Sequence, residues 1–493
     1  MTPVSTDLQQ NIQAFNHLFS DCADIKKRAM KLGREAKKEC FIAYVEVAVG
    51  NMLLENSVLG KLINTLWEMP EEKIIFYLRE NGFGISDVSE FETIEEAGSG
   101  MLTGDAIFFI DGYDRALKIS DKGYPGMGVK ETESEKVIRG SNEGFSESVK
   151  VNTALIRKRL RTPKVKVRES FAGRRSNTNV DLVYMEDLVH PDLLAAIEKR
   201  LESFEIDGVL DSGIIEQLTE GSWLSPFPQF QTTGRPDRAA MAILEGRVVL
   251  LVDNSPIALL LPTGYNSFIQ TSDDYYSRWE IASFTRVLRY VASFLAMTLP
   301  GLYLAVTNFH TQILPTDLLL SFAAARQGVP FPAVVEILIM ELAFELLREA
   351  GVRLPGPMGN TIGIVGGLII GQAAVEANIV SPIVVIVVAL TALCSFAIPN
   401  EEFATAFRIL KFGFILLCAA FGFFGFLLSL LTVLIHLSHL NSFGIPYLMP
   451  FVGPDLNDYE DERDTFLRMP LRKLTRRPIY TREDARVKLK MKD

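Results

Sequence analysis

Three carboxylates lie within an apolar stretch, where charged side chains are rare. Glu336, Glu341 and Glu345 fall inside residues 331–350. At helical spacing Glu341 and Glu345 share one face, and Glu336 lies about 140° away from Glu341. Because ionisable groups at membrane depth are costly, they usually face a water-filled cavity or a cationic partner. Two interpretations stay open: a ring of carboxylates that attracts cations at a pore mouth, or internal ion pairs with nearby arginines.

A second candidate site lies at residues 360–379, which a helix would divide into two different faces. One face has polar ends around an apolar middle, formed by Thr361, Val365, Leu368, Gln372 and Glu376. The roughly opposite face carries small residues at four-residue spacing, Gly363, Gly367 and Gly371. Such spacing lets helices approach closely in lipid. The pattern is typical of a pore-lining helix in which Val365 and Leu368 form a gate that closes by dewetting. The alternative is an ordinary buried helix.

Other chemistry has little support in the sequence. His436 and His439 are three residues apart, but no third ligand accompanies them, so we expect interfacial histidines and no metal. The four cysteines lack CxxC spacing and predict no disulfide framework. The sequence has no nucleophile elbow, phosphate loop or zinc signature. We therefore expect no catalytic residues, no cofactor and no enzymatic activity.

These candidates lie in a chain whose character changes along its 493 residues. Residues up to about 280 are charged and read as soluble, residues 284–440 are apolar, and residues 455–493 are charged again. About 20 apolar residues in a helix cross a bilayer. We therefore predict an integral membrane protein with four to six membrane segments. Expected spans are 286–309, 360–379, 382–398 and 408–438, with further segments at 314–326 and 331–350. Pro300 should kink or break the first span.

The soluble part reads as two small α/β subdomains without an internal repeat. Strands, helices and two hairpins alternate along it, the hairpins turning at Asp111-Gly112 and Asn254-Ser255. Residues 1–35 read as a polar helical lead, and residues 206–210 as a strand. The predicted fold is therefore multi-domain, a soluble N-terminal α/β part followed by an all-α polytopic membrane domain. The expected parts are 1–130 (subdomain 1), 131–280 (subdomain 2), 281–450 (transmembrane helical domain) and 451–493 (charged tail).

The charge pattern also predicts a topology. Basic residues crowd behind the last apolar stretch, which marks the cytoplasmic side of a membrane and favours anionic lipid. We expect this tail to be a solvated topology anchor. Acidic residues in the same tail argue against nucleic-acid binding. The first residues, MTPVSTDLQQ, lack the apolar core of a signal peptide, so the N-terminal domain is expected on the cytoplasmic side too.

Short motifs follow one another in order over roughly residues 135–450. They include RGSNEGF (139–145), NTALIRKRLRTP (152–163), LEGRVVLLVDNSP (244–256), SDDYYSR (272–278), GVPFP (328–332), GQAAV (371–375) and SFGIPYLMP (442–450). With these motifs the chain resembles the A subunits of the GerA-type spore germinant receptors. It departs from the family pattern at Gly234, where a glutamate is expected, and at Asn254, where a glycine is expected.

The resemblance implies a membrane subunit of a spore germination complex in the inner membrane of the bacterial endospore. It implies a homo-oligomeric ring that releases monovalent cations when a nutrient germinant is sensed. The implied partners are a transporter-like B subunit, a lipoprotein C subunit and membrane lipid, with the N-terminal domain and tail on the core side. Two other classes remain open. One is a secondary transporter subunit with Glu336 and Glu341 as its coupling-ion site. The other is a non-conducting membrane scaffold.

Overall fold

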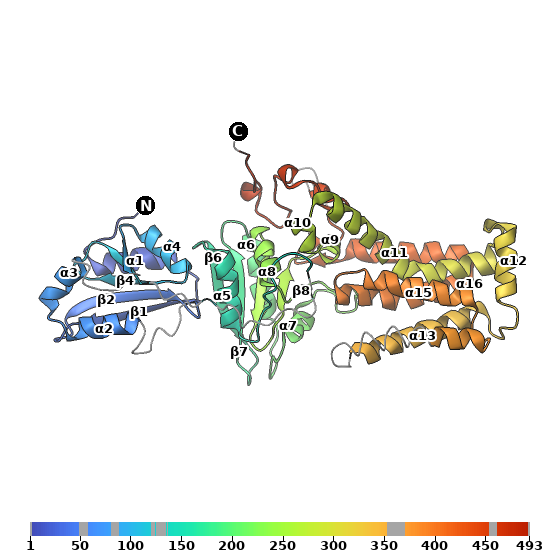
Figure 1. The fold of residues 1–493 in the computed structure, drawn as a ribbon, viewed down its shortest axis with the longest axis horizontal. Coiled ribbons are helices and arrows are strands. Elements are labelled where there is room, and N and C mark those ends of the chain that lie inside the picture. Colours follow the sequence, from blue (N-terminus) through green and yellow to red (C-terminus); the bar gives the residue numbers. More distant parts are fainter. Residues whose placement is uncertain are drawn as a thin grey trace.

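The computed structural model describes residues 2–48, 58–79, 88–119, 124, 135, 137–352, 370–452 and 461–491. The molecule is elongated, with one α/β unit at its N-terminal end, a second in the middle and long helices at the other end (Figure 1). The predicted fold class is confirmed, because α/β units with antiparallel sheets precede a helical region.

The first α/β unit is a five-stranded antiparallel sheet with helices on both faces, in the strand order β1-β2-β4-β5-β3. Successive side chains of a strand point to opposite faces. On β2, Phe41 and Ala43 therefore pack with helices α1 and α4, whereas Cys40 and Ile42 pack with α2 and α3. The elements are α1 (Leu8–Leu18), β1 (Ile25–Leu32), β2 (Lys38–Val45), α2 (Val58–Glu68), α3 (Glu71–Arg79), β3 (Val88–Phe91), α4 (Ile94–Leu102), β4 (Ala106–Ile110) and β5 (Ala116–Ile119).

The second α/β unit has the strand order β6-β7-β9-β10-β8, again fully antiparallel. Helices α5 and α8 cover the face that carries Val183 and Leu251, and α6 and α7 cover the face that carries Leu182 and Leu250. The elements are α5 (Val149–Arg159), β6 (Val165–Ala172), β7 (Thr178–Met185), α6 (Pro191–Leu201), α7 (Ser212–Thr219), β8 (Gln231–Thr233), α8 (Pro236–Leu244), β9 (Val248–Val252) and β10 (Ala258–Leu261). Both predicted hairpins are present.

The two units share one topology, so the expectation of no internal repeat is wrong. Their elements follow in the same order, and their sheets correspond strand for strand. The same local contacts also recur. The Asn11 side chain accepts a hydrogen bond from the Ser5 N–H at 2.8 Å and donates to its carbonyl at 2.7 Å. Asn152 makes both bonds to Ser146 at 2.7 Å. The repeat lies in backbone topology and a few bonding positions, which a hydrophobic pattern does not reveal.

Two local predictions in these units are also wrong. Residues 1–35 are not a helical lead, because α1 buries Phe15 in the first core and β1 is the edge strand of the sheet. Strand β1 is buried only at its ends, Ile25 and Leu32, so it shows no alternation, and its basic residues suit an exposed edge. Residues 206–210 form a loop rather than a strand, because they find no strand partner.

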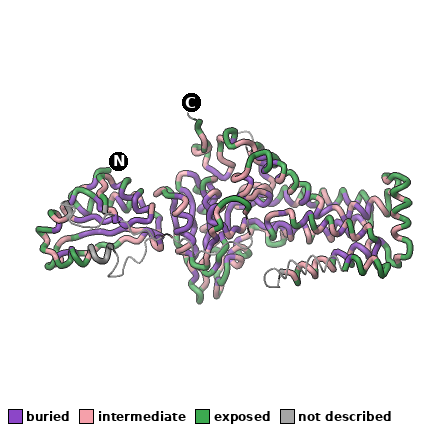
Figure 2. Tube along the Cα trace, in the orientation of Figure 1, coloured by how far each residue is buried: buried purple, intermediate pink, exposed green. Residues whose placement is uncertain are grey.

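The helical region follows two short helices and ends in a folded tail. Its elements are α9 (Tyr265–Ile269), α10 (Asp273–Tyr276), α11 (Trp279–Phe309), η1 (Thr311–Ile313), α12 (Thr316–Ala325), α13 (Ala333–Val352), α15 (Pro382–Phe396), α16 (Glu401–His439), β11 (Asn441–Ser442), β12 (Ile445–Pro446), η2 (Asp461–Asp464), η3 (Leu471–Lys473) and η4 (Glu483–Ala485). Figure 2 shows the central strands of both units, β2, β4, β7 and β9, largely buried, whereas α12 has no buried residue.

By length and composition, two helices of the described residues are apolar enough to cross a membrane, α11 and α16. The helix expected at 382–398 has 15 residues, about 22 Å, which is less than the hydrocarbon thickness of a bilayer. Helix α11 runs through Pro300 without the break that the proline allowed. A Cβ built at Gly301 would lie 3.1 Å from the Phe414 carbonyl oxygen and 3.0 Å from Cys418 Sγ, so α16 supports α11 closely at this point.

Helix α16 is a hairpin of two antiparallel arms rather than the single tilted span predicted for 408–438. Gly422 has φ +58° and ψ −133°, which interrupts the helix. The rings of Phe407 and His436 lie 5.6 and 6.1 Å from the same Phe227 ring. In a straight helix, 29 residues would separate them by about 43 Å. The arms, 401–421 and 423–439, are about 31 and 25 Å long, so both ends of α16 lie beside the second α/β unit.

Candidate functional site

Five of the eight residues predicted to line a pore or pack its helix lie outside the described residues, namely Thr361, Gly363, Val365, Gly367 and Leu368. The other three lie in the helical residues 370–376. Gly371 is buried, and a Cβ built there would lie 3.2 Å from Val385 Cγ1 of α15. Gln372 and Glu376 are exposed, and Gln372 Nε2 donates to Glu376 Oε1 at 3.0 Å. The small residue thus meets the neighbouring helix, and the polar residues lie on the open side.

The first predicted carboxylate, Glu336, is fully buried at the start of α13. It accepts a hydrogen bond from the Ser381 N–H at 2.8 Å, and Arg326 lies 3.2 Å from its other oxygen. Ser381 is the N-cap of α15, and Arg326 follows α12. Glu336 therefore ties three helices together at the end of the bundle away from the soluble units (Figure 1).

The other two carboxylates pair with cations of the first arm of α16. Lys411 Nζ lies 2.5 Å from Glu341 and 3.4 Å from Glu345, and Arg408 lies 3.7 Å from Glu345. Glu341 and Lys411 are both buried. Removing one partner of such a pair costs about 3–5 kcal/mol because a buried charge is left unpaired. These contacts correspond to the internal ion-pair interpretation.

The two histidines do not form a metal site with each other. His436 Nε2 lies 2.8 Å from Ser225 Oγ in the second unit, and His439 is exposed. Within the described ranges, no group of three or more His, Cys, Asp or Glu side chains is placed to hold a metal ion.

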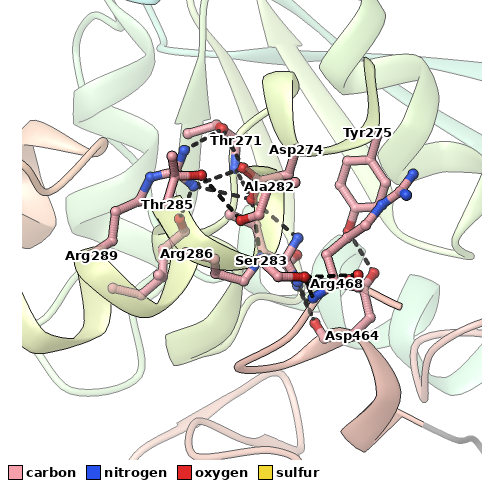
Figure 3. A network of polar contacts seen from close by, with 12 residues as sticks. Thr271, Asp274, Tyr275, Ala282, Ser283, Thr285, Arg286, Arg289, Asp464 and Arg468 are labelled. Atoms are coloured by element: carbon pink, nitrogen blue, oxygen red, sulfur yellow. Dashed lines mark hydrogen bonds and ion pairs between the residues drawn. The ribbon is translucent and has the colours of Figure 1, made fainter. Parts of the chain in front are cut away.

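A network of polar contacts lies where the second unit, the start of α11 and the C-terminal tail meet (Figure 3). Arg286 of α11 is fully buried and lies 3.1 Å from Asp274 and 2.6 Å from Asp464 of the tail. Arg289 supports Asp274 from the next turn at 2.9 Å. The Ser283 hydroxyl donates to the Arg468 carbonyl at 3.0 Å and accepts from its N–H at 3.1 Å. Side chains and backbone of the tail are therefore fixed to α11.

The tail then runs over the second unit instead of extending into solvent. The Arg482 N–H donates to the Leu188 carbonyl at 2.9 Å, and Thr481 pairs with Val189 in an isolated antiparallel bridge. Asp461 accepts a hydrogen bond from the Ile479 N–H at 3.1 Å. The tail is folded against the second unit, where Arg477 donates to the Leu244 carbonyl at 3.0 Å, but Arg472 and Lys473 remain exposed to solvent. Its role as a topology anchor stays a prediction. The tail and the second unit lie on the same side of any bilayer.

Burial changes the acid–base properties of this junction. It raises the pKa of the Asp461 carboxyl to about 7, although the hydrogen bond from the Ile479 N–H opposes this rise. The nearby carboxylates Glu245 and Asp464 raise this pKa further, and Lys488 lowers it. Burial likewise raises the pKa of the Tyr275 hydroxyl, which donates to Asp464 at 2.7 Å. Asp461 therefore changes its charge near neutral pH, whereas the Tyr275 hydroxyl stays protonated there.

A second buried ion pair joins the two α/β units. Arg157 of α5 is fully buried and donates to both oxygens of Asp24, at 2.7 and 3.0 Å. The backbone N–H of Ala23 donates to the Val167 carbonyl at 3.0 Å, so the loop before β1 lies against the edge strand β6. The units are thereby linked end to end. The sequence analysis missed both junctions. Arg286 gave a signal because it is a charge within a largely apolar helix, whereas Arg157 belongs to the basic run at the end of α5 and gave none.

Comparison with known proteins places these features in a family. The sequence model described as "Bacillus/Clostridium GerA spore germination protein" matches residues 13–480. The chain is 39% identical to the uncharacterized membrane protein YfkQ of Bacillus subtilis over 493 residues, which cover 100% of this chain and 94% of that one. It is 40% identical to spore germination protein GerLA of Bacillus cereus over 83% of each chain. It is 37% identical to spore germination protein B1 of Bacillus subtilis over 98% of each chain.

Among solved structures, the N-terminal domain of the A subunit of the Bacillus megaterium spore germinant receptor GerK3 matches with a TM-score of 0.42 and 27% identity. That match covers 53% of this chain and 96% of the solved one. The family model spans both α/β units, the helical region and most of the folded tail. The chain belongs to the GerA family of spore germination proteins.

Proposed function

We propose that this chain is the A-type membrane subunit of a spore germinant receptor and forms a gated pathway for monovalent cations. Its partners would be further copies in a ring, a transporter-like B-type subunit, a lipoprotein C-type subunit and the inner-membrane lipid of the endospore. Family membership supports the germination context. The soluble units and the tail, which lie on one side together, would face the spore core.

The observation that best supports a cation pathway is that residues 370–376 have one face packed on a neighbouring helix and one exposed polar face. Gly371 packs against α15, whereas Gln372 and Glu376 remain exposed in a region of apolar helices. Uncovered polar groups at membrane depth are costly unless they face water. They would therefore face a water-filled path, with Thr361 at its other end and Val365 and Leu368 as the gate between them.

The carboxylates on α13 take a different role in this proposal. Each of them contacts a cationic side chain of the same chain. Glu336, Glu341 and Glu345 therefore hold the helices in register rather than forming a cation-attracting ring. A coupling-ion site of a transporter would also need these carboxylates free to exchange partners, so the pairs argue against that class.

Conductance of the reconstituted full-length protein tests the proposal. We expect a cation-selective current that rises in Val365→Ala, because a smaller side chain hydrates the gate more easily. Val388→Ala is the matched control, since it makes the same change at a buried position of α15. Silence of all three proteins, folded and oligomeric and recorded also with the B-type and C-type subunits, would contradict the pathway and favour a scaffold.

A further inference from the structure

We propose that the N-terminal part of α11 and the adjoining part of the tail form a platform that binds the headgroup region of an anionic bilayer. The platform consists of residues 281–291 of α11 and residues 466–473 of the tail. Neither part enters the cation pathway proposed above, so this inference does not rest on ion conduction.

The first observation is that the start of α11 exposes apolar side chains and buries a charged one, which is the reverse of a surface helix in a soluble protein. Ile281, Phe284, Leu288 and Val291 are 49–71% exposed. At helical spacing these four side chains lie within about 80° of one another. Arg286, on the opposite side, is fully buried in the junction network. A surface helix in water places its charges outward and its apolar stripe inward. The outer face of this segment is therefore built for a partner less polar than water.

The tail segment that packs on α11 carries exposed apolar side chains of its own. Phe466, Leu467 and Leu471 are 50–54% exposed. The contacts between Ser283 and Arg468 hold the tail beside α11, and the Phe466 ring lies 4.8 Å from the Tyr290 ring. By helical spacing Ser283 and Tyr290 lie at least about 80° from the exposed stripe of α11, so the tail packs on the flank of this helix and carries a second exposed apolar set of its own. Apolar patches of this kind mark interaction sites when they are rimmed by polar residues.

The rim identifies the partner as lipid headgroups. Arg278, Arg472 and Lys473 are exposed on the same two segments as the apolar side chains, together with one exposed carboxylate, Glu280, and Trp279 begins the helix. Basic residues at a membrane boundary attract anionic lipid, and tryptophan prefers the interface between lipid and water. The same helix continues into a candidate membrane span, which places its start at the bilayer surface. A second copy of this face would bring like charges together, which disfavours self-association through it.

Environment-sensitive labels on the full-length protein in lipid vesicles test the platform. Phe284→Cys and Leu471→Cys would carry a fluorescent label, and the four native cysteines, all buried, would remain. Phe171→Cys is the matched control, because Phe171 is 60% exposed on β6 of the second unit. We expect blue-shifted emission and quenching by brominated lipid chains at 284 and 471, but not at 171. Quenching should be stronger in vesicles with phosphatidylglycerol than in phosphatidylcholine alone.

A second arm tests the basic rim. Replacing Arg472 and Lys473 by serine should remove most of the increase in quenching that phosphatidylglycerol causes. The labelled protein should remain folded. Water-like emission at 284 would overturn the proposal. So would a label that is shielded from water and unquenched by brominated lipid but transfers energy between labelled copies, because that outcome assigns the face to a second copy. Loss of cation current in the same vesicles, with quenching intact, would contradict only the proposed function.

Discussion

Replacing Arg286 by methionine should release the C-terminal tail. Methionine keeps the volume of the side chain but removes its contacts with Asp274 and Asp464, both made at 3.1 Å or less. Breaking a buried pair from one side costs about 3–5 kcal/mol. Asp274 keeps its contact with Arg289 at 2.9 Å, so the lower end applies. At 1.4 kcal/mol per factor of ten, the equilibrium for opening of the tail should rise roughly hundredfold.

Amide hydrogen exchange of the purified protein measures this opening directly, because local opening governs exchange in a folded molecule. The reporter is the Arg482 N–H, which is protected by the Leu188 carbonyl only while the tail is in place. Arg174→Met is the control, since Arg174 is 71% exposed and lies 3.9 Å from its partner, Glu205. Exposed pairs contribute little. If Arg286→Met exchanges as slowly as the wild type at this amide, the tail is held without the network and the reasoning is refuted.

Three further predictions follow from the same structure. Raising the pH from about 4 to above 7 should weaken the tail contacts, because burial raises the pKa of Asp461 to about 7 and the stability that its protonated form contributes is lost as it ionises. Hydrogen exchange of the tail amides should become faster over this pH range. Asp461→Asn should flatten the pH dependence of this exchange. Gly422→Ala should lower the thermal stability, because Gly422 has φ +58° and its new Cβ would lie 2.7 Å from a ring carbon of α11, whereas Gly413→Ala, with nothing within 4 Å, should leave stability unchanged or higher. Lys411→Met should cost about 3–5 kcal/mol in unfolding free energy, and adding Glu341→Leu should restore most of it; equal losses in the single and double variants would contradict the buried pair.

Sequence patterns predicted those elements whose signals are local. The hairpins expected at Asp111-Gly112 and Asn254-Ser255 combine a turn dipeptide with apolar strands, and both hairpins formed. The first turn is at Asp111-Gly112 as expected, and the second lies one residue earlier, at Asp253-Asn254. The hairpin inside α16 has no comparable signal. Its turn is a single Gly422 within an apolar run, and glycine is frequent in membrane helices that do not turn. The reversal is seen in the backbone angles of Gly422 and in the contacts from Phe227 to both arms.

The candidate sites show the same limit. Periodicity placed Glu341 and Glu345 on one helix face, but the partner that neutralises both, Lys411, lies 66 residues or more along the chain. In the tail, the number of charges and the contacts that they make differ even more. Its arginines and lysines resemble a solvated anchor in composition, yet Arg468 is 3% exposed and Asp464 closes a network with α11. Composition reports how many charges a segment carries and not which of them find partners.

The two kinds of ion pair in this chain have different mechanical consequences. The pairs of α13 with α16 lie within one bundle, so they hold these two helices in register with each other. The pairs of Arg286 join α11 to the tail and to α10, and α10 is linked to the second unit because the Tyr276 hydroxyl donates to Asp237 of α8. A shift of α11 relative to α10 and the tail would break these pairs. A partner that binds the soluble units can move the helices only if it binds two positions of a connecting helix with different affinities. The start of α11 contacts both α10 and the tail. Under the lipid platform proposed above, a movement of this segment would therefore change its ion pairs and its contact with lipid together.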